Sequence, residues 1–434
     1  MKDTSRHAAY TVLLEMEREN AYSNIGLDRA LSRLAMERRE KAFLTRLVNG
    51  VTERRLTLDH NIRLYLRQNS RLKPNVRTLL RMGAYELLFC DGVPARASVN
   101  EYVALSKTVG AAYASGMINA ILRRIAEHGL TLPANGAENY LSVKYSLPLA
   151  TVACFEKIYG GETEKFLASL FDRTKIYGRI NTTKTTFAAL QSQLAAEGIG
   201  ITAAPDFDEA FYFDDTAAFM ETDAFRQGLF HIQDLASIAA SRLLEIQPGM
   251  TVLDVCAAPG GKSFTAAELL GGTGSVTACD IHKHKVALIA KGAVRLGLPN
   301  MRAVLRDATA PDGSALYDRI ICDVPCSGLG VLRKKPEIRY KSIDDLSELT
   351  ALQYKILDAS AASLKVGGRL VYSTCTVTQC ENEDIIEKFL ASHENFAPAR
   401  QTLPVGTAGA YGVRFAPHAD DCDGFYACGL IRRS

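Results

Sequence analysis

Long hydrophobic runs are missing from this 434-residue sequence, and no apolar stretch approaches the roughly 18 residues that a membrane-spanning helix needs. The first seven residues lead directly into an amphipathic pattern, without the apolar segment of a signal peptide. Internal repeats and low-complexity segments are lacking as well. We therefore expect a cytoplasmic protein without a membrane anchor, built from two or three globular domains.

Cysteine is too sparse to form a disulfide scaffold, because the chain has ten in 434 residues and thiols stay reduced without export. Each cysteine is then a core residue, a ligand or a catalyst. Six suit core positions, namely Cys90, Cys154, Cys279, Cys322, Cys422 and Cys428. The spacings of four cysteines also fall within the range of zinc ligands, namely Cys322, Cys326, Cys375 and Cys380. However, Cys322 lies inside a predicted strand, so its side chain should face away from that of the next residue, Asp323. We therefore expect no metal site.

Charge is unevenly distributed along the chain, although the formal total is only +3. Residues 1–135 contain 21 Lys and Arg against 13 Asp and Glu, whereas the remaining residues contain 30 against 35. A basic module joined to a mildly acidic one indicates a polyanionic partner, such as nucleic acid, for the first part. A solvated helical surface that happens to be basic explains the charge equally well, so both explanations stay open.

Helical periodicity dominates residues 1–133, for which we predict an all-α domain. Ser5 is a candidate cap for the first helix, and Pro74 opens a third. Ser98, with a Glu three residues later, predicts a capping box for a fourth helix. Residues 137–230 mix helical stretches with short strand-like runs, which indicates a small α+β module.

From residue 231 to 434, strands alternate with helices, which is typical of a parallel sheet in a doubly wound α/β fold. The predicted strands are 251–255, 275–279, 301–306, 318–322 and 369–373. The predicted helices are 263–270, 283–296, 344–364 and 382–390. In the common strand order the fourth and fifth strands are neighbours about 5 Å apart, so the residues that follow them should meet at one edge of the sheet.

The segment after the first of these strands, from Asp254 to Ser263, is rich in small residues. Small residues at the carboxyl end of a first strand let a ligand approach the backbone. A phosphate loop would need Gly at the position of Cys256, and the dinucleotide pattern G-x-G-x-x-G is absent. Neither a phosphate loop nor NAD binding is therefore favoured.

Four successive strands end in or beside an aspartate, namely Asp254, Asp280, Asp307 and Asp323. Any one of them alone is best explained as a helix cap. An acid after the second strand also suits a ribose diol, and the later acids could face an adenine amino group or a reacting base. The set as a whole favours a nucleoside ligand.

Two cysteines follow the fourth and fifth strands, Cys326 in Asp-Val-Pro-Cys-Ser-Gly and Cys375 in Ser-Thr-Cys-Thr. Carbon 5 of cytosine is too poor a nucleophile to attack a methyl sulfonium, but addition of a thiolate at carbon 6 creates an enamine that can. Such a reaction needs one nucleophilic Cys, an acid near ring nitrogen 3 and a base for the proton at carbon 5. Asp323, Cys326 and Cys375 match in residue type, without indicating which thiol attacks.

Three motifs resemble the hallmarks of the NOL1/NOP2/Sun family of RNA 5-methylcytosine methyltransferases, namely Cys256–Lys262 (CAAPGGK), Asp323–Gly328 (DVPCSG) and Ser373–Thr376 (STCT). The resemblance extends to two further stretches, Gln233-Asp234 and Asp423–Tyr426. Residues 80–88 and 97–107 are similar to NusB-like RNA-binding domains. The combination resembles the bacterial RsmB (Sun/Fmu) branch of the family.

The resemblance implies a Rossmann-like domain at residues 231–434 that binds S-adenosylmethionine, preceded by a NusB-like domain at 1–133 and the small module at 137–230. It implies that Cys375 is the nucleophile and that Cys326 assists product release, while Asp323 remains the candidate for the acid that the chemistry requires. The implied cofactor contacts are Cys256, Ala257, Ala258, Pro259, Gly260, Gly261, Lys262, Asp280, Asp307 and Asp323.

The resemblance also implies a substrate in 16S rRNA, with cytosine 967 as the target. The sequence departs from the family's usual residues at 233–237 and at 335–338. Both departures bear on the branch of the family to which the chain is assigned more than on the type of reaction. The alternatives are an RNA-binding assembly factor with an inactive methyltransferase-like domain, the same chemistry on another RNA, and a DNA cytosine methyltransferase. The intact set of Asp323, Cys326 and Cys375 argues against the first, and the Thr-Cys motif against the last. The sequence does not indicate the oligomeric state, and a monomer is the default.

Overall fold

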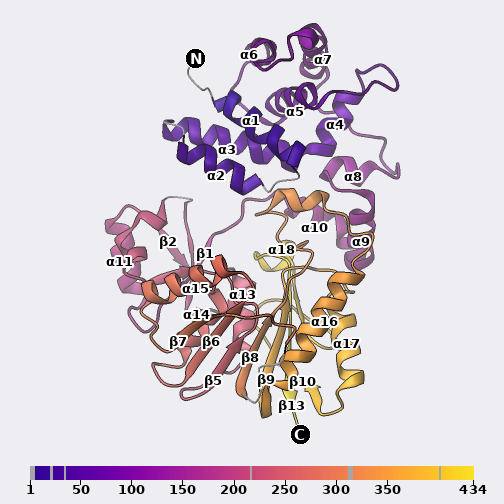
Figure 1. Ribbon diagram of the computed structural model, residues 1–434. Helices are drawn as coiled ribbons and strands as arrows, with labels where there is room; N and C mark the ends of the chain where they lie inside the picture. The colour runs from indigo at the N-terminus through magenta and orange to yellow at the C-terminus, as the bar shows by residue number, and fades with distance from the viewer. Residues whose placement is uncertain (1–4, 20–22, 34–35, 216–217, 311–315, 400–401) are drawn as a thin grey trace. The chain divides into compact units, whose positions relative to one another are not determined.

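The computed structural model describes residues 5–19, 23–33, 36–215, 218–310, 316–399 and 402–434. The chain forms two compact units, of which unit 1 comprises residues 1–157 and 335–342 and unit 2 comprises residues 158–334 and 343–434 (Figure 1). The division into domains at 1–133, 137–230 and 231–434 stays a prediction. Residues 1–4 belong to the amino-terminal stretch in which we expect no signal peptide, and they lie outside the described residues.

Unit 1 is helical and has a core of its own. Its elements are α1 (Ser5–Glu19), α2 (Ser23–Arg33), α3 (Arg38–Glu53), α4 (Arg55–Arg63), α5 (Pro74–Phe89), α6 (Ala95–Thr108), η1 (Ala112–Ala114), α7 (Ser115–His128), α8 (Tyr140–Tyr145) and η4 (Pro336–Tyr340). Pro74 opens α5 as predicted. The capping box at Ser98 is wrong, because α6 already begins after Pro94, and Ser98 lies buried within the helix. Ser5 lies within α1 rather than before it as a cap.

Unit 1 contains a short segment, residues 335–342, that lies in the sequence between two elements of unit 2. The Tyr340 hydroxyl accepts a hydrogen bond from the backbone N of Arg55 at 3.0 Å and donates one to the backbone O of Glu53 at 3.1 Å. It also lies 2.8 Å from the hydroxyl of Ser146, and the Arg55 guanidinium stacks 3.6 Å from the ring centroid. Arg339 is fully buried, 3.7 Å from the Glu53 carboxylate. The segment is thus built into the helical unit.

Unit 2 begins with a small antiparallel sheet in the order β2-β3-β1-β4. Its strands are β1 (Tyr177–Ile180), β2 (Ile201–Ala203), β3 (Ala210–Phe213) and β4 (Phe230–Ile232). The helices along this stretch are α9 (Leu149–Tyr159), which begins in unit 1, η2 (Gly160–Glu162), α10 (Thr163–Ser169), α11 (Phe187–Ala196), η3 (Phe219–Glu221) and α12 (Asp223–Arg226). Aromatic rings of Phe211, Phe213 and Phe230 meet in its core.

The large sheet of unit 2 has the order β11-β12-β13-β9-β8-β5-β6-β7, with β10 paired to β13. Its strands are β5 (Thr251–Asp254), β6 (Ser275–Asp280), β7 (Met301–Leu305), β8 (Tyr317–Asp323), β9 (Leu364–Thr374), β10 (Phe396–Pro398), β11 (Thr407–Ala408), β12 (Val413–Phe415) and β13 (Phe425–Arg432). Pairing from β7 to β9 is parallel, and β8 and β9 are neighbours as predicted. The strand order reverses between β5 and β8, where α/β sheets bind their ligands.

Helices cover both faces of this sheet (Figure 1). They are α13 (Leu235–Arg242), α14 (Gly261–Leu269), α15 (Lys283–Leu296), α16 (Ser347–Ala362) and α17 (Glu383–Ser392), followed by the short α18 (Pro417–Asp420). Alternate side chains of one strand enter different cores, so that Ile321 packs with α13 to α15 and Cys322 packs with α16 and α17. This alternation confirms that Cys322 faces away from Asp323, the next residue.

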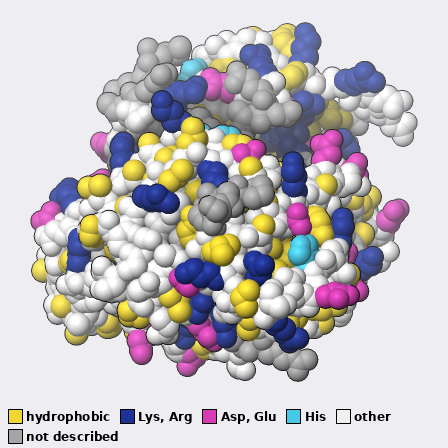
Figure 2. Space-filling model, turned by 60° about the horizontal axis from the view of Figure 1, so that its bottom comes forward, with side chains coloured by type: hydrophobic (Ala, Val, Ile, Leu, Met, Phe, Trp, Pro, Cys, Tyr) yellow, Lys and Arg dark blue, Asp and Glu magenta, His cyan; other side chains and the backbone are white. Residues whose placement is uncertain are grey.

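The antiparallel strands at the carboxyl end were not predicted from the sequence. β13 pairs with β9 over six residues, from Tyr426 opposite Thr374 to Ile431 opposite Arg369. The sheet is therefore mixed rather than purely parallel. None of the helices in the described segments is long and apolar enough to cross a membrane. On the face shown in Figure 2, Lys and Arg side chains are interspersed with acidic and apolar ones.

Candidate active site

The loop after β5 presents backbone rather than large side chains. Gly260 has φ +121°, which only glycine adopts without strain, and α14 begins at the next residue. The Cys256 side chain is mostly buried, and this burial raises the pKa of its thiol. Residues 256–262 therefore form a cradle of small residues at the point where the strand order reverses.

Asp254 and Asp280 end the two strands next to this loop, and both are buried. Asp254 Oδ2 accepts a hydrogen bond from the Ser263 hydroxyl at 2.5 Å, while Oδ1 is buried and has no hydrogen-bond partner within the described part of the chain. Burial raises the pKa of Asp254 to about 7. Asp280 Oδ1 accepts from the backbone N of His282 at 2.9 Å. Its other oxygen has no partner among the described residues and is free to bind a hydroxyl.

Asp307, the third acid, is different because it is exposed and lies two residues after β7. Its Oδ1 accepts hydrogen bonds of 2.8 Å from both the backbone N and the hydroxyl of Thr309. These bonds lower the pKa of Asp307. The turn that they form accounts for these bonds without a ligand, but no helix begins here among the described residues, so Asp307 is not the helix cap of the capping alternative.

Asp323 ends β8 and is held from two sides. Lys262 Nζ lies 2.7 Å from its Oδ2, and the Ser373 hydroxyl donates to its Oδ1 at 2.7 Å. Lys262 comes from the first turn of α14 and Ser373 from β9, where it is the register partner of Asp323. Lys262 also lies 4.9 Å from the ring centroid of Phe425. Lys262 and Ser373 therefore hold the Asp323 carboxylate in place at the point where the strand order reverses.

The two predicted cysteines lie together, with their Sγ atoms 3.1 Å apart. Both cysteines are partly exposed, whereas four of the six predicted core cysteines are buried, namely Cys279, Cys322, Cys422 and Cys428. The other two, Cys90 and Cys154, are only half-buried. The hydrogen bond with Cys375, followed by burial, raises the pKa of Cys326 well above its usual value. A close thiol pair of this kind holds one proton more firmly than the other.

Behind the thiols lies a polar network that the sequence analysis missed. The residues after each cysteine, Ser327 and Thr376, lie 2.7 Å apart through their hydroxyl oxygens. Ser327 also donates to the buried carboxylate of Glu381 at 2.6 Å. In the sequence, an acidic residue just before a helix looks like an ordinary helix-start charge, so no local signal identified it.

A second polar group consists of Lys334 and two acids, Asp234 and Asp423, which belong to the two stretches that extended the family resemblance. Lys334 Nζ lies 2.7 Å from carboxylate oxygens of both Asp234 and Asp423. Burial is the largest influence on both acids, but Lys334 keeps the pKa of Asp234 below its usual value. Burial and the charge of Asp234 raise the pKa of Asp423 to about 6. Next to this pair, Gly424 N donates to Gly330 O at 2.9 Å, so the group supports the loop that carries Cys326.

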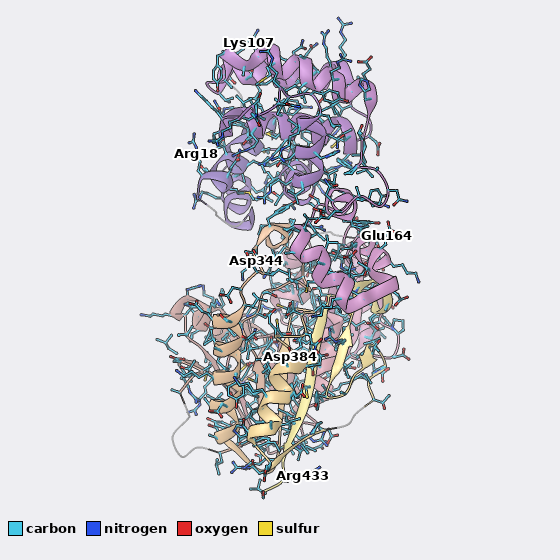
Figure 3. The ribbon with its side chains drawn as sticks, turned by 90° about the vertical axis from the view of Figure 1, so that its right-hand side faces the viewer. Arg18, Lys107, Glu164, Asp344, Asp384 and Arg433 are labelled. Carbon is cyan, nitrogen blue, oxygen red and sulfur yellow. The ribbon has the colours of Figure 1, made fainter. Side chains whose placement is uncertain are left out.

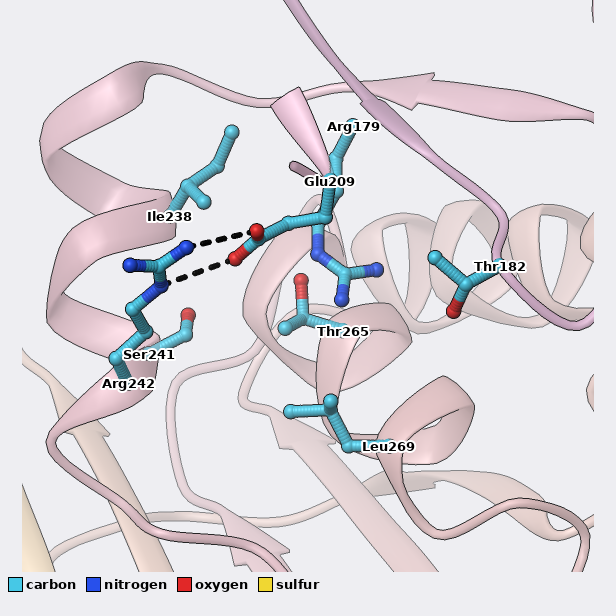
Figure 4. Close-up of a pocket in the computed structure, with 8 residues that line it drawn as sticks. All are labelled: Arg179, Thr182, Glu209, Ile238, Ser241, Arg242, Thr265 and Leu269. Carbon is cyan, nitrogen blue, oxygen red and sulfur yellow. Dashed lines mark hydrogen bonds and ion pairs between the residues drawn. The ribbon is translucent and has the colours of Figure 1, made fainter. Parts of the chain in front are cut away.

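A cavity of about 280 Å³ lies elsewhere in unit 2, between β1, α13 and α14 (Figure 4). Arg242 forms two hydrogen bonds with Glu209 along its wall, of 3.1 and 2.8 Å, and Arg179 pairs with Glu268. Charges at this cavity are therefore balanced, and it includes none of the predicted site residues. Among the described residues, no group of His, Cys, Asp and Glu is arranged to hold a metal ion.

Comparison with known proteins gives the same family as the motifs. A family model described as 16S rRNA methyltransferase RsmB/F matches residues 241–431, and a NusB family model matches residues 3–127. The chain is 34% identical, over the full length of both chains, to the Bacillus subtilis protein named "Probable ribosomal RNA small subunit methyltransferase B". It is 30% identical to the ribosomal RNA small subunit methyltransferase B of Pseudomonas putida, over 82% of each chain.

Solved structures show the same architecture. The crystal structure of PH0851 matches with a TM-score of 0.83 and 26% identity over 98% of both chains. That of NSun6 from Pyrococcus horikoshii with SFG matches with a TM-score of 0.62 and 23% identity, over 66% of this chain and 98% of that one, and shows the fold alone. The predicted Rossmann-like and NusB-like folds are confirmed. The chain belongs to the RsmB/F family of 16S rRNA methyltransferases, with an amino-terminal domain of the NusB family.

Proposed function

We propose that this enzyme converts a cytosine of 16S rRNA, cytosine 967 by the resemblance, to 5-methylcytosine through a covalent adduct with Cys375. The observation that carries the proposal is the pair of thiols 3.1 Å apart, on loops that follow neighbouring strands. Asp323 ends the first of these strands. A nucleophile, an acidic group and a second thiol are thus within reach of one base.

S-adenosylmethionine is the methyl donor, and supplies an electrophilic methyl group when bound. The residues fit this cofactor because small residues lead from β5 into the Gly260-Gly261 pair at the start of α14, and Asp280 has a free carboxylate oxygen for a ribose hydroxyl. Ile281 follows with a 58% exposed side chain, which suits contact with the flat face of a purine. Asp254 and Asp307 complete the row of acids, although Asp307 forms its own turn.

Addition to the base requires a thiolate at Cys375 and a partner for ring nitrogen 3. As sulfur bonds to carbon 6, ring nitrogen 3 takes up a proton from solvent and gives it back when Cys375 leaves, and the carboxylate of Asp323 would accept a hydrogen bond from this N3–H and stabilise the adduct. Lys262 and Ser373 hold both oxygens of Asp323, so the carboxylate is oriented before the base arrives. Pre-organised groups of this kind need no reorganisation during the reaction.

Proton transfer then follows from the coupling of the two thiols. Because its pKa is raised, Cys326 stays protonated in the free enzyme, and its S–H donates a hydrogen bond to the Cys375 thiolate. Once Cys375 becomes a thioether it carries no charge, so the pKa of Cys326 falls and its proton is released to solvent. The Cys326 thiolate can then take the proton from carbon 5, and the electron pair of that C–H bond expels Cys375.

Unit 1 is proposed to dock on the rRNA through phosphate contacts, which fix register more than sequence. Exposed basic side chains in this unit support the proposal, among them Arg18 and Lys107, which are labelled in Figure 3. Others are Arg38, Arg39, Lys41, Arg63, Arg67 and Arg71. Residues 137–230 are proposed to bridge to the catalytic domain. A 16S rRNA substrate would place the enzyme in the cytoplasm.

The test is methyl transfer from labelled S-adenosylmethionine to small-subunit rRNA, with the modified nucleotide mapped by mass spectrometry. Cys375→Ala should abolish transfer, and Cys326→Ala should accumulate a covalent protein–RNA adduct that resists denaturing gels. Cys380→Ala, an exposed cysteine outside the pair, is the matched control and should retain activity. Wild-type transfer by Cys375→Ala would refute the assignment of the nucleophile. No transfer by any form would favour an assembly factor.

A further inference from the structure

The loop between β9 and α17 buries a carboxylate without an ionic partner. Glu381 is fully buried just before the start of α17, where Asp384 is labelled in Figure 3. Among the described residues, no Lys or Arg pairs with it. A buried carboxylate is costly unless several hydrogen bonds compensate for the lost water, so its surroundings need an explanation.

Four hydrogen bonds compensate Glu381, and they come from three parts of the chain. Oε1 accepts from the backbone N of Ser327 at 2.8 Å and from Gln353 Nε2 at 2.9 Å. Oε2 accepts from the hydroxyls of Ser327 and Thr378, each at 2.6 Å. Ser327 follows Cys326, and Gln353 lies on α16. The carboxylate therefore ties the loop of Cys326 to the loop that follows Cys375.

The direction of these bonds extends the tie to Cys375. Ser327 has a single hydroxyl proton and donates it to Glu381, so the Thr376 hydroxyl, 2.7 Å away, must donate to Ser327. Thr376 directly follows Cys375. The two residues next to the reactive cysteines are thus joined to each other and, through Ser327, to one buried charge.

The other side of Cys326 is fixed by the same network. Gln353 Nε2, while donating to Glu381, also donates to the backbone O of Pro325 at 2.9 Å. The Tyr372 hydroxyl donates to the backbone O of Glu381 at 2.6 Å, which anchors the loop to β9. Both neighbours of Cys326 therefore depend on groups that Glu381 organises.

We propose that Glu381 is a positioning residue that sets the 3.1 Å separation of the Cys326 and Cys375 thiols, by holding the backbone on which each thiol is carried. It touches neither thiol. Its importance for catalysis rests on the proposed function, since a proton passes between these thiols only if they stay in contact. Its effect on their separation does not depend on that function.

A cross-linking experiment measures the separation without catalysis. Diamide oxidises two neighbouring thiols to a disulfide and is itself reduced to the hydrazine, taking both protons and both electrons. In the full-length wild type, Cys326 and Cys375 should cross-link readily, as read by peptide mass. Glu381→Ala and Ser327→Ala should slow this about tenfold or more. Ser360→Ala, which also removes a buried serine hydroxyl but lies outside the network, should cross-link at the wild-type rate.

Kinetics give a second readout. A misplacement of about 1 Å can cost about 100-fold in rate, so Glu381→Ala should lower kcat about 100-fold, with KM for RNA and cofactor within about twofold. Glu381→Gln keeps the shape and can donate to Ser327 and Thr378 once their hydroxyls reverse, so it should stay within about tenfold of wild type. Ser327→Ala, the smaller change, covers the case in which Glu381→Ala does not fold.

Folded Glu381→Ala and Ser327→Ala that both cross-link and turn over at wild-type rates would overturn the proposal. Slow cross-linking of both variants, with Ser360→Ala unchanged, supports it even if Cys375 proves not to be the nucleophile. Failure of the proposed function would instead appear as methyl transfer by Cys375→Ala, which leaves the cross-linking of the Glu381 variants unaffected.

Discussion

Asp254 should make the folded protein less stable as the pH rises through the acidic range. Burial raises the pKa of this carboxyl from its usual 3.8 to about 7, and the hydrogen bond from Ser263 only partly opposes the shift. Between these two values the unfolded chain releases the proton while the folded chain retains it. The free energy of unfolding then falls by up to about 1.4 kcal/mol per pH unit, or about 4 kcal/mol in total, and is flat above pH 7.

Asp254→Asn keeps the shape of the side chain and removes its titration. The stability of the variant relative to wild type should therefore increase from pH 4 to pH 7 by up to about 4 kcal/mol. For a domain of this size, about 2–4 °C of Tm accompanies each kcal/mol, so the Tm difference should change by roughly 10 °C. The assay is thermal unfolding by circular dichroism, without cofactor, at half-unit pH steps.

Asp318→Asn is a control of opposite sign. Burial of Asp318 is outweighed by hydrogen bonds from Thr251 and Lys365, so its pKa is lowered. It contributes stability above its unfolded pKa that is lost as the pH falls through its folded pKa. Asp318→Asn should thus become less stable relative to wild type as the pH rises into the range where the folded carboxyl is ionised. A stability difference for Asp254→Asn that does not change with pH would refute the reasoning about Asp254.

Two substitutions test the other buried groups. Lys334→Met removes the cation between Asp234 and Asp423, which should cost about 3–5 kcal/mol in thermal unfolding. The loss should be greater at pH 8 than at pH 5, because Asp423 is protonated at the lower pH, and an equal loss would contradict this account. Tyr340→Phe leaves the partly buried backbone N–H of Arg55 without its acceptor and should cost unit 1 about 1 kcal/mol. Faster hydrogen exchange at the Arg55 amide would report it, and unchanged exchange would count against it.

Much of unit 2 could be predicted from sequence because parallel strands and their helices obey local patterns. The carboxyl ends of β8 and β9 could be placed together because the common strand order makes them neighbours, and Asp323 is indeed opposite Ser373. β13 was missed because residues 425–431 show no alternation of apolar and polar side chains, and the antiparallel partner strand is more than 50 residues away. Pairing between such distant segments leaves no local signal.

The same limit applies to the site. The reactive residues follow the ends of strands and are of types that commonly take part in catalysis, so Cys326 and Cys375 could be identified from the sequence. Glu381 could not, because its partners Ser327 and Gln353 lie 54 and 28 residues away and come together only in the folded chain. Ser98 is the opposite case, because its local sequence matches a capping box but α6 already begins at Ala95.

The presence of residues 335–342 within unit 1 has a consequence for synthesis on the ribosome. The chain emerges from its amino terminus, so residues 1–157 are available long before the segment that completes their unit. At roughly 5–20 residues per second, this segment is made roughly 10–40 s later. Until then Arg55 and Ser146 lack their contacts with Tyr340. The unit made first is therefore finished only after most of the catalytic unit has been translated.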